Sequence, residues 1–232
     1  AGFPKPQNYI LGCDMAGVVE AAGSSVTQFG PGDEVYAACS SALAEYVSVA
    51  EDKLALKPAN LTFEQAAAIP TAAITALKGL RDVGKLQPGQ KVLINGASGG
   101  VGTFAVQLAK LHGAEVTGVD NAGKLDFLRL LGVDHVIDYT REDFTHNGQK
   151  YDVIFDVIGK SSFSRGLRSL REGGLYLLAN PGPAHLIQAP FGALSGGRRI
   201  VMGTAIRKQA DLLYLAKLIE TLSYIGDDAE IV

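Results

Sequence analysis

Short apolar runs alternate with segments of helical periodicity over most of this chain. From about residue 62 onward, continuously apolar runs are followed by segments with apolar residues at every third or fourth position. Continuously apolar strands between helices are typical of a parallel sheet that is buried on both faces. This part of the chain therefore predicts an α/β fold with a Rossmann, doubly wound parallel sheet.

The same pattern places the elements of this domain. Strands are predicted at 92–95, 115–119, 135–138, 151–156, 175–179 and 199–202, and helices at 71–83, 100–112, 124–131, 163–170 and 209–222. A further helix is predicted to begin at Thr62. Thr62 and Gln65 have the spacing of a capping box, in which each side chain accepts a hydrogen bond from the backbone N–H of the other residue.

The first sixty residues show a different pattern, with turn signals between short strand-like segments. Strands are predicted at 15–20, 34–38 and 44–49, and Gly30–Asp33 predicts a tight turn. Regularly spaced short strands indicate an antiparallel, barrel-like unit. We therefore expect two domains, at residues 1–60 and 61–232.

Composition limits the classes of partner. The net charge is −3, and charged residues make up 19% of the chain. This balance gives no electrostatic reason to expect nucleic acid or an anionic membrane as the partner, and no apolar run approaches the length of a membrane span. The chain has two cysteines, and its first residues lack the pattern of a signal peptide. We expect a cytoplasmic protein, with an organelle left open because a targeting segment could have been removed.

The clearest candidate for chemistry is the glycine-rich turn Gly96–Gly102. It lies between a predicted strand and a predicted helix, which is the context that a dinucleotide-binding fingerprint requires. The three fingerprint positions are Ala97, Gly99 and Gly102. Gly99 would leave room for a pyrophosphate, Gly102 would allow close helix–strand packing, and free N–H groups at the helix start would face the phosphate charge. The alternative is a glycine-rich turn without a ligand.

Asp120 ends the next predicted strand. An acidic residue at this place can accept hydrogen bonds from the adenosine ribose, and its charge would repel a 2′-phosphate. The sequence therefore predicts that NADH is preferred over NADPH, although Lys124 in the following loop could reach a 2′-phosphate. The alternative is that Asp120 is a helix N-cap or a loop acid.

Several segments together resemble a known family. Residues 86–109 (LQPGQKVLINGASGGVGTFAVQLA) and 131–139 (LGVDHVIDY) closely resemble the nucleotide-binding core of quinone-oxidoreductase-like proteins in the medium-chain dehydrogenase/reductase superfamily. Residues 12–20 (GCDMAGVVE) and 31–35 (PGDEV) resemble the GroES-like β-barrel catalytic domain of the same family. The resemblance implies that nicotinamide lies in a cleft between the two domains and that the protein is a homodimer through Rossmann edge strands.

The resemblance also implies which residues bind NAD(P)H. They are Thr75, Gly99, Gly100, Val101, Gly102, Asp120, Asn121, Lys124, Tyr139, Ile158, Gly159 and Asn180. Thr75 could instead cap or pack a helix, and Tyr139 could instead be a half-buried core residue. No catalytic residue can be assigned.

Two departures from the family concern zinc and completeness. Zinc-dependent relatives have Gly-His-Glu where this chain has Gly12-Cys13-Asp14, and two cysteines cannot form a four-cysteine cluster. We therefore expect a zinc-free protein in which Cys13 is a small packing residue. The chain begins just before this segment and ends without the usual return to the first domain, so we expect the GroES-like domain to be incomplete.

The leading hypothesis for function is hydride transfer from NAD(P)H to a quinone or an α,β-unsaturated carbonyl without zinc. Without a metal, the oxygen of this small-molecule acceptor would have to be polarised by hydrogen bonds, and Tyr36, Ser40 and Ser41 are hydroxyl residues that could border the cleft. The alternatives are an alcohol or aldehyde dehydrogenase of the same superfamily and a non-catalytic, nucleotide-binding redox sensor or scaffold.

Overall fold

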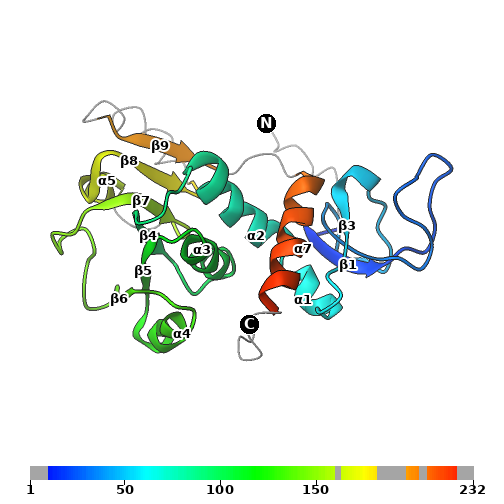
Figure 1. The fold of residues 1–232 in the computed structure, drawn as a ribbon, viewed down its shortest axis with the longest axis horizontal. Helices are drawn as coiled ribbons and strands as arrows, with labels where there is room; N and C mark the ends of the chain where they lie inside the picture. Colours follow the sequence, from blue (N-terminus) through cyan, green and yellow to red (C-terminus); the bar gives the residue numbers. More distant parts are fainter. Residues whose placement is uncertain (1–9, 160–162, 182–196, 204–207, 224–232) are drawn as a thin grey trace, which may run out of the picture. The chain divides into compact units, whose positions relative to one another are not determined.

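The computed structural model describes residues 10–159, 163–181, 197–203 and 208–223. Two compact units make up the chain (Figure 1). One consists of residues 1–74 and 206–232, and the other consists of residues 75–205. We call them the small-sheet unit and the large-sheet unit. No described helix combines the length and the apolar composition that a membrane crossing needs.

The large-sheet unit is built on six parallel strands in the order β6-β5-β4-β7-β8-β9. The strands are β4 (Lys91–Asn95), β5 (Glu115–Asp120), β6 (His135–Asp138), β7 (Tyr151–Asp156), β8 (Leu170–Leu178) and β9 (Arg199–Met202). The predicted doubly wound sheet is confirmed, and β6, β7 and β9 have the predicted bounds.

The helices of this unit lie on both sides of the sheet. They are α3 (Gly100–Leu111), the 3₁₀ turn η3 (Ala122–Lys124), α4 (Leu125–Leu130) and α5 (Phe163–Arg168). Figure 1 shows α3 and α4 on one side and α5 on the other. The chain moves outward from β4 to β6 in one direction and from β7 to β9 in the other. Right-handed crossovers then require helices on opposite faces and a switch of direction between β4 and β7.

A helix with two kinds of backbone geometry precedes the large sheet. Helix α2 (Pro70–Leu77) continues as the π-helical segment η2 (Lys78–Val83), so the predicted helix at 71–83 is confirmed in extent. A Cβ built at Gly79 would lie 3.1 Å from the Phe155 ring, so glycine lets η2 approach β7 closely. Sequence periodicity does not distinguish π from α geometry.

The small-sheet unit contains three antiparallel strands in the order β1-β2-β3. Its elements are β1 (Asp14–Val18), β2 (Glu34–Ala38), the 3₁₀ turn η1 (Glu51–Lys53), β3 (Leu54–Leu56), α1 (Phe63–Ala67) and α7 (Gln209–Ser223). The capping box at the start of α1 is confirmed. The N–H of Gln65 donates to Thr62 Oγ1, and the N–H of Thr62 donates to Gln65 Oε1.

One predicted strand of this unit is wrong. Residues 44–49 form no strand, and the side chain of Tyr46 is 75% exposed. A strand needs a partner as well as an alternating pattern, and the free edge of β2 is taken by β3 at Leu54–Leu56.

The last helix packs within the small-sheet unit. The hydroxyl of Tyr36 on β2 donates to the Leu212 carbonyl on α7 at 2.7 Å, and the Gln209 amide donates to the Leu54 carbonyl on β3 at 2.8 Å. The contacts therefore group α7 with residues 1–74. The domain boundary at residue 60 stays a prediction.

Candidate functional site

The carboxyl edge of the large sheet gathers nearly all of the residues singled out by the sequence. In a parallel sheet, the segments that follow the strands emerge at one edge, and ligands bind there near the switch point. The glycine-rich turn follows β4, Asp120 ends β5 and Tyr139 follows β6. Ile158 and Gly159 follow β7, and Asn180 follows β8.

Steric constraints explain two glycines of the turn. Gly96 has a φ of +86°, and a Cβ there would lie 2.6 Å from Ile158 Cγ1. A Cβ at Gly102 would lie 2.1 Å from the Gly96 carbonyl oxygen, so Gly102 allows the close approach of α3 to the turn. Ala97 is fully buried, and its N–H donates to the Val119 carbonyl. The left-handed position that requires glycine is therefore Gly96, which the fingerprint positions did not include.

Gly99 has a different environment. A Cβ built there meets nothing closer than the Gly96 carbonyl at 3.5 Å, which is ordinary van der Waals contact. Its backbone, at φ −78° and ψ 168°, is accessible to any residue. The fold therefore does not require glycine at position 99, whereas a ligand that approaches the backbone would.

The N-terminus of α3 is open to an anion. Gly99 is the N-cap of this helix, and no side chain of the described residues caps it. The N–H groups of Gly100, Val101 and Gly102 precede the first intrahelical bond, which Thr103 N–H makes to the Gly99 carbonyl. Unpaired N–H groups and the helix dipole favour negative charge, so these residues fit the pyrophosphate of a dinucleotide.

Asp120 is held by donors from two directions. Its side chain is nearly buried, with 8% of the residue exposed. Oδ2 accepts from Ser98 N–H at 3.0 Å and from the Ser98 hydroxyl at 2.7 Å. Oδ1 accepts from Asn121 N–H at 2.9 Å and from the Asn121 amide at 3.2 Å. Asp120 therefore joins the end of β5 to the glycine-rich turn and is not a helix N-cap.

The residues after Asp120 form an exposed rim. Asn121 caps η3 by accepting from Gly123 N–H at 3.1 Å, and Lys124 is exposed. Tyr139 N–H donates to the Asp120 carbonyl at 3.1 Å, and the Tyr139 side chain is 56% exposed. The alternative of a half-buried core tyrosine is therefore wrong.

A buried polar cluster lies at the same edge and was missed in the sequence. Asp156 is 1% exposed; Oδ1 accepts from the Asn95 amide at 2.9 Å and from Gly159 N–H at 2.9 Å, and Oδ2 accepts from the Tyr176 hydroxyl at 2.8 Å. Asp156 thus ties β4, β8 and the turn after β7 together. Asp120 was singled out in the sequence because it is an acidic residue at the end of a buried strand. Asp156 has the same signal and could have been found by it.

The remaining predicted residues differ in their placement. Gly159 has a φ of +68°, and a Cβ there would lie 2.6 Å from the Asn180 carbonyl, so these two backbone segments are brought together. Ile158 is 38% exposed and Asn180 is exposed. Thr75 is half-buried on α2, and no hydrogen bond among the described residues joins it to the others.

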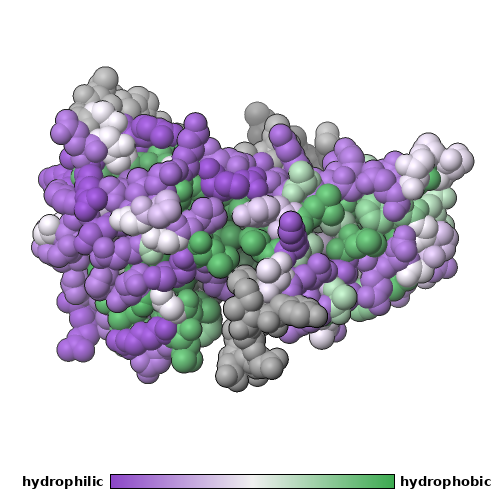
Figure 2. Space-filling view, in the orientation of Figure 1, coloured by the Kyte–Doolittle hydropathy of each residue, from purple (hydrophilic) through white to green (hydrophobic). Residues whose placement is uncertain are grey.

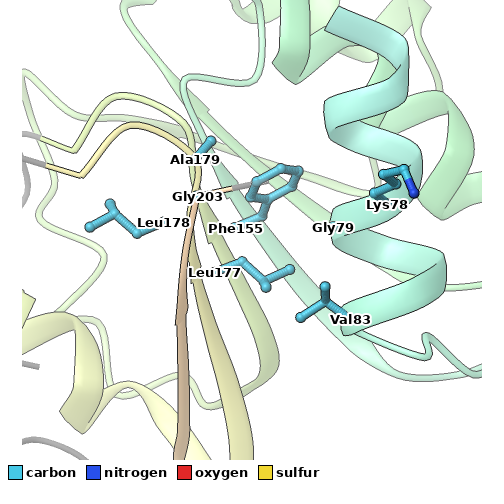
Figure 3. Close-up of a pocket in the computed structure, with 8 residues that line it drawn as sticks. All are labelled: Lys78, Gly79, Val83, Phe155, Leu177, Leu178, Ala179 and Gly203. Carbon is cyan, nitrogen blue, oxygen red and sulfur yellow. The ribbon is translucent and has the colours of Figure 1, made fainter. Parts of the chain in front are cut away.

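The gap between η2 and the large sheet is not a ligand pocket. Its volume is about 10 Å³, close to the minimum for one water molecule. Figure 3 shows Val83, Phe155 and Leu177 between η2 and the strands, whereas the amine of Lys78 is directed away from them. The amine lies 3.4 Å from Asp82 Oδ2. Over the visible face of the large-sheet unit, Figure 2 shows mainly hydrophilic residues with separate hydrophobic patches.

The segment Gly12–Asp14, where zinc-dependent relatives have Gly-His-Glu, lies in the small-sheet unit. Among the described residues, no group of three or more His, Cys, Asp or Glu side chains is placed to hold a metal ion. Cys13 is exposed and does not pack in the core of its unit, so the expectation that Cys13 is a small packing residue is wrong. Asp14 Oδ1 accepts from Thr71 N–H at 2.7 Å, so this carboxylate is used at the start of α2.

The hydroxyl of Tyr36 is also used within the fold. Tyr36 is fully buried, and burial, with a smaller contribution from the charge of Glu220, raises the pKa of its hydroxyl. The bond to Leu212 leaves this group no proton to donate elsewhere.

A doubly wound sheet with a glycine-rich turn at its switch point defines a dinucleotide-binding α/β protein. Two family models match the chain: "Zinc-binding dehydrogenase" over residues 100–221 and "Alcohol dehydrogenase GroES-like domain" over residues 1–59. The chain belongs to the medium-chain dehydrogenase/reductase superfamily, in its quinone-oxidoreductase-like branch.

Curated relatives are similar in sequence. A 2-methylene-furan-3-one reductase of Solanum lycopersicum is 40% identical, over 73% of this chain and 46% of the relative. A chloroplastic NADPH-dependent alkenal/one oxidoreductase of Arabidopsis thaliana is 41% identical over the same shares. A chloroplastic quinone-oxidoreductase homolog of Spinacia oleracea is 33% identical, over 94% of this chain and 70% of the relative. The chain thus spans about half the length of the first two relatives.

Solved structures share the fold. The quinone oxidoreductase of Coxiella burnetii superposes with a TM-score of 0.82 and 31% identity, over 91% of this chain and 68% of that one. The Escherichia coli quinone oxidoreductase complexed with NADPH has a TM-score of 0.78 and 28% identity, over 95% of this chain and 72% of that one.

Proposed function

We propose that this protein is a zinc-independent, NAD(P)H-dependent oxidoreductase that transfers a hydride to a quinone or an α,β-unsaturated carbonyl. The observation that carries the proposal is the N-terminus of α3, which no side chain in the described part of the chain caps and which follows Gly99, in a chain similar to reductases named for enones and quinones. Bound NAD(P)H would supply the hydride, and the protein would hold the cofactor and position the acceptor.

The proposed cofactor residues divide by the part of the cofactor that they would contact. Gly99 to Gly102 would hold the pyrophosphate. Asp120, Asn121, Lys124 and Tyr139 would border the adenosine half, while Thr75, Ile158, Gly159 and Asn180 would border the nicotinamide half. We propose that residues 1–60 contribute the substrate side of the protein and that the cofactor side lies within residues 61–232.

A preference for NADH is the finer part of the proposal. The negative charge of Asp120 at the end of β5 supports it, because this charge opposes a 2′-phosphate. The exposed ammonium of Lys124 acts in the opposite direction, and the Arabidopsis thaliana relative is named NADPH-dependent. We further propose a homodimer and a cytoplasmic location; the homodimer rests on the sequence resemblance, and the location rests on the low cysteine content.

The first test is an assay of the full-length protein with NADH and NADPH, side by side, against a panel of quinones, enones and aldehydes. We expect turnover with quinones or enones that is faster with NADH and insensitive to a chelator. Alcohol oxidation with NAD that a chelator inhibits would select the dehydrogenase alternative. Cofactor binding without turnover of any acceptor would select the sensor or scaffold alternative.

The matched variant for this test is Gly99→Val. Position 99 has room for a Cβ and a backbone conformation that any residue adopts, so we expect normal stability but loss of cofactor binding and of turnover. Gly17→Val is the control, because Gly17 lies on β1 and a Cβ built there meets nothing within 4 Å. Normal cofactor affinity in Gly99→Val would contradict the placement of the pyrophosphate.

A further inference from the structure

We infer that Asp120 is a positioning residue that locks the glycine-rich turn, and that it acts on cofactor choice through its charge rather than by accepting hydrogen bonds from the adenosine ribose. The inference rests on the proposed function, because it concerns the same cofactor site. It changes which contact selects the cofactor.

The first argument is the number of acceptor positions. An ionised carboxylate has two oxygens with about four lone-pair positions in total. Four donors of this chain already point at Asp120: two from Ser98 on Oδ2 and two from Asn121 on Oδ1, at 2.7 to 3.2 Å. A ribose hydroxyl would have to displace one of these donors, and exchanging one hydrogen bond for another yields little net affinity.

The second argument is where the donors come from. Asn121 is the next residue, but Ser98 lies 22 residues earlier, in the turn between the buried Ala97 and the open Gly99. Its N–H and hydroxyl bonds to Oδ2 fix the turn against the end of β5. The N–H groups at the start of α3 directly follow this turn. Their direction therefore depends on the two Ser98–Asp120 bonds, which are present without a cofactor.

The third argument concerns the charge that remains. Asp120 as a whole residue is 8% exposed, and the partners of its carboxylate are neutral amide and hydroxyl donors. Hydrogen bonds from neutral groups leave the full negative charge in place beside the predicted adenosine pocket. This charge disfavours a 2′-phosphate without any bond to the ribose.

The test measures dissociation constants of the full-length protein for NADH, NADPH and an NADH analogue that lacks the adenosine 2′-hydroxyl, together with the melting temperature without cofactor. In the wild type we expect NADH and the deoxy analogue to bind within about threefold of each other. Ser98→Ala should lower the melting temperature and weaken NADH and NADPH by a similar factor of about five to tenfold. Ser98→Thr, which keeps the hydroxyl, should restore both properties.

The control is Thr145→Ala. Thr145 gives the same pair of donors, N–H and hydroxyl, to Asp143 at 2.9 and 2.6 Å, but in the loop between β6 and β7. We expect a change in melting temperature without a change in cofactor affinity.

Two results would overturn the inference. One is a loss of tenfold or more with the deoxy analogue in the wild type. The other is unchanged or tighter NADH binding in Ser98→Ala. If Asp120 accepts a hydrogen bond from the ribose, removal of the Ser98 hydroxyl would free a lone pair of Asp120 for that bond. If the wild type binds no nucleotide at all, the proposed function fails. The lock is then tested by the melting temperatures of Ser98→Ala, Asp120→Ala and the double variant: losses that simply add would refute it.

Discussion

Two carboxylates at the carboxyl edge of the large sheet, Asp120 and Asp156, are satisfied by donors from neighbouring segments. Asp156 receives bonds from β4, from β8 and from the turn after β7, and only 1% of the residue is exposed. A buried carboxylate is stable only when its oxygens are bonded. The geometry of the Ile158–Gly159 turn therefore depends on Asp156, although Asp156 need not touch a ligand.

Tyr176→Phe tests this dependence. The change removes the 2.8 Å bond from the Tyr176 hydroxyl to Asp156 Oδ2 and leaves a buried oxygen with one donor fewer. We expect the free energy of unfolding to fall by about 1–3 kcal/mol, measured by urea denaturation. Tyr46→Phe, at a side chain that is 75% exposed, should have no effect. An unchanged urea midpoint in Tyr176→Phe would show that the hydroxyl does not stabilise the cluster.

At the scale of elements, Asp134 joins helix α3 to strand β5. Its carboxylate accepts from Lys110 Nζ on α3 at 2.7 Å and from Val116 N–H on β5 at 2.7 Å. Partial burial alone would raise the pKa of Asp134, but these two hydrogen bonds, together with the charge of Lys110 and a smaller contribution from His135, lower the pKa below its ordinary value. The ionised Asp134 carboxylate therefore stabilises the fold above the pKa that this residue has in the unfolded chain, about 4. This stabilisation is lost as the pH falls through the lower pKa of Asp134 in the folded protein.

Asp134→Asn should therefore lower the melting temperature at neutral pH, by an amount equivalent to about 1 kcal/mol for this partly exposed pair. The difference from the wild type should shrink as the pH is lowered from about 5 to 3. Asp126→Asn is the control, because Asp126 pairs with Arg129 while its side chain is 97% exposed. A difference that stays constant over this range would mean that the charge of Asp134 does not contribute.

Local patterns predicted these elements well, because a buried strand or an amphipathic helix leaves its periodicity in a few adjacent residues. The pattern failed at 44–49, where pairing depends on a partner strand that lies elsewhere in the sequence. The glycine-rich turn could be predicted for the same local reason. The hydrogen bonds from Ser98 to Asp120 and from Asn95 to Asp156 could not be predicted in this way, because they span 22 and 61 residues.

At the scale of the whole molecule, the chain enters the small-sheet unit twice. Residues 1–74 and 206–232 form one compact unit, and the bond between Tyr36 and Leu212 spans 176 residues. The periodicity of α7 predicts a helix and its apolar face, but not the sheet on which that face packs. For this reason the sequence assigned α7 to the Rossmann domain, whereas its contacts lie with β2 and β3.

Tyr36→Phe tests whether the small-sheet unit opens separately from the large-sheet unit. The variant loses the 2.7 Å bond to the Leu212 carbonyl, which leaves a fully buried site without its donor, and we expect a loss of about 1–2 kcal/mol. Hydrogen exchange followed residue by residue should accelerate for the amides of β2 and α7, while the amides of β4 and β5 serve as the internal control. Equal acceleration in both sets would mean that the two units unfold as a single cooperative body. Acceleration confined to β2 and α7 would show that α7 stabilises the unit to which its contacts assign it.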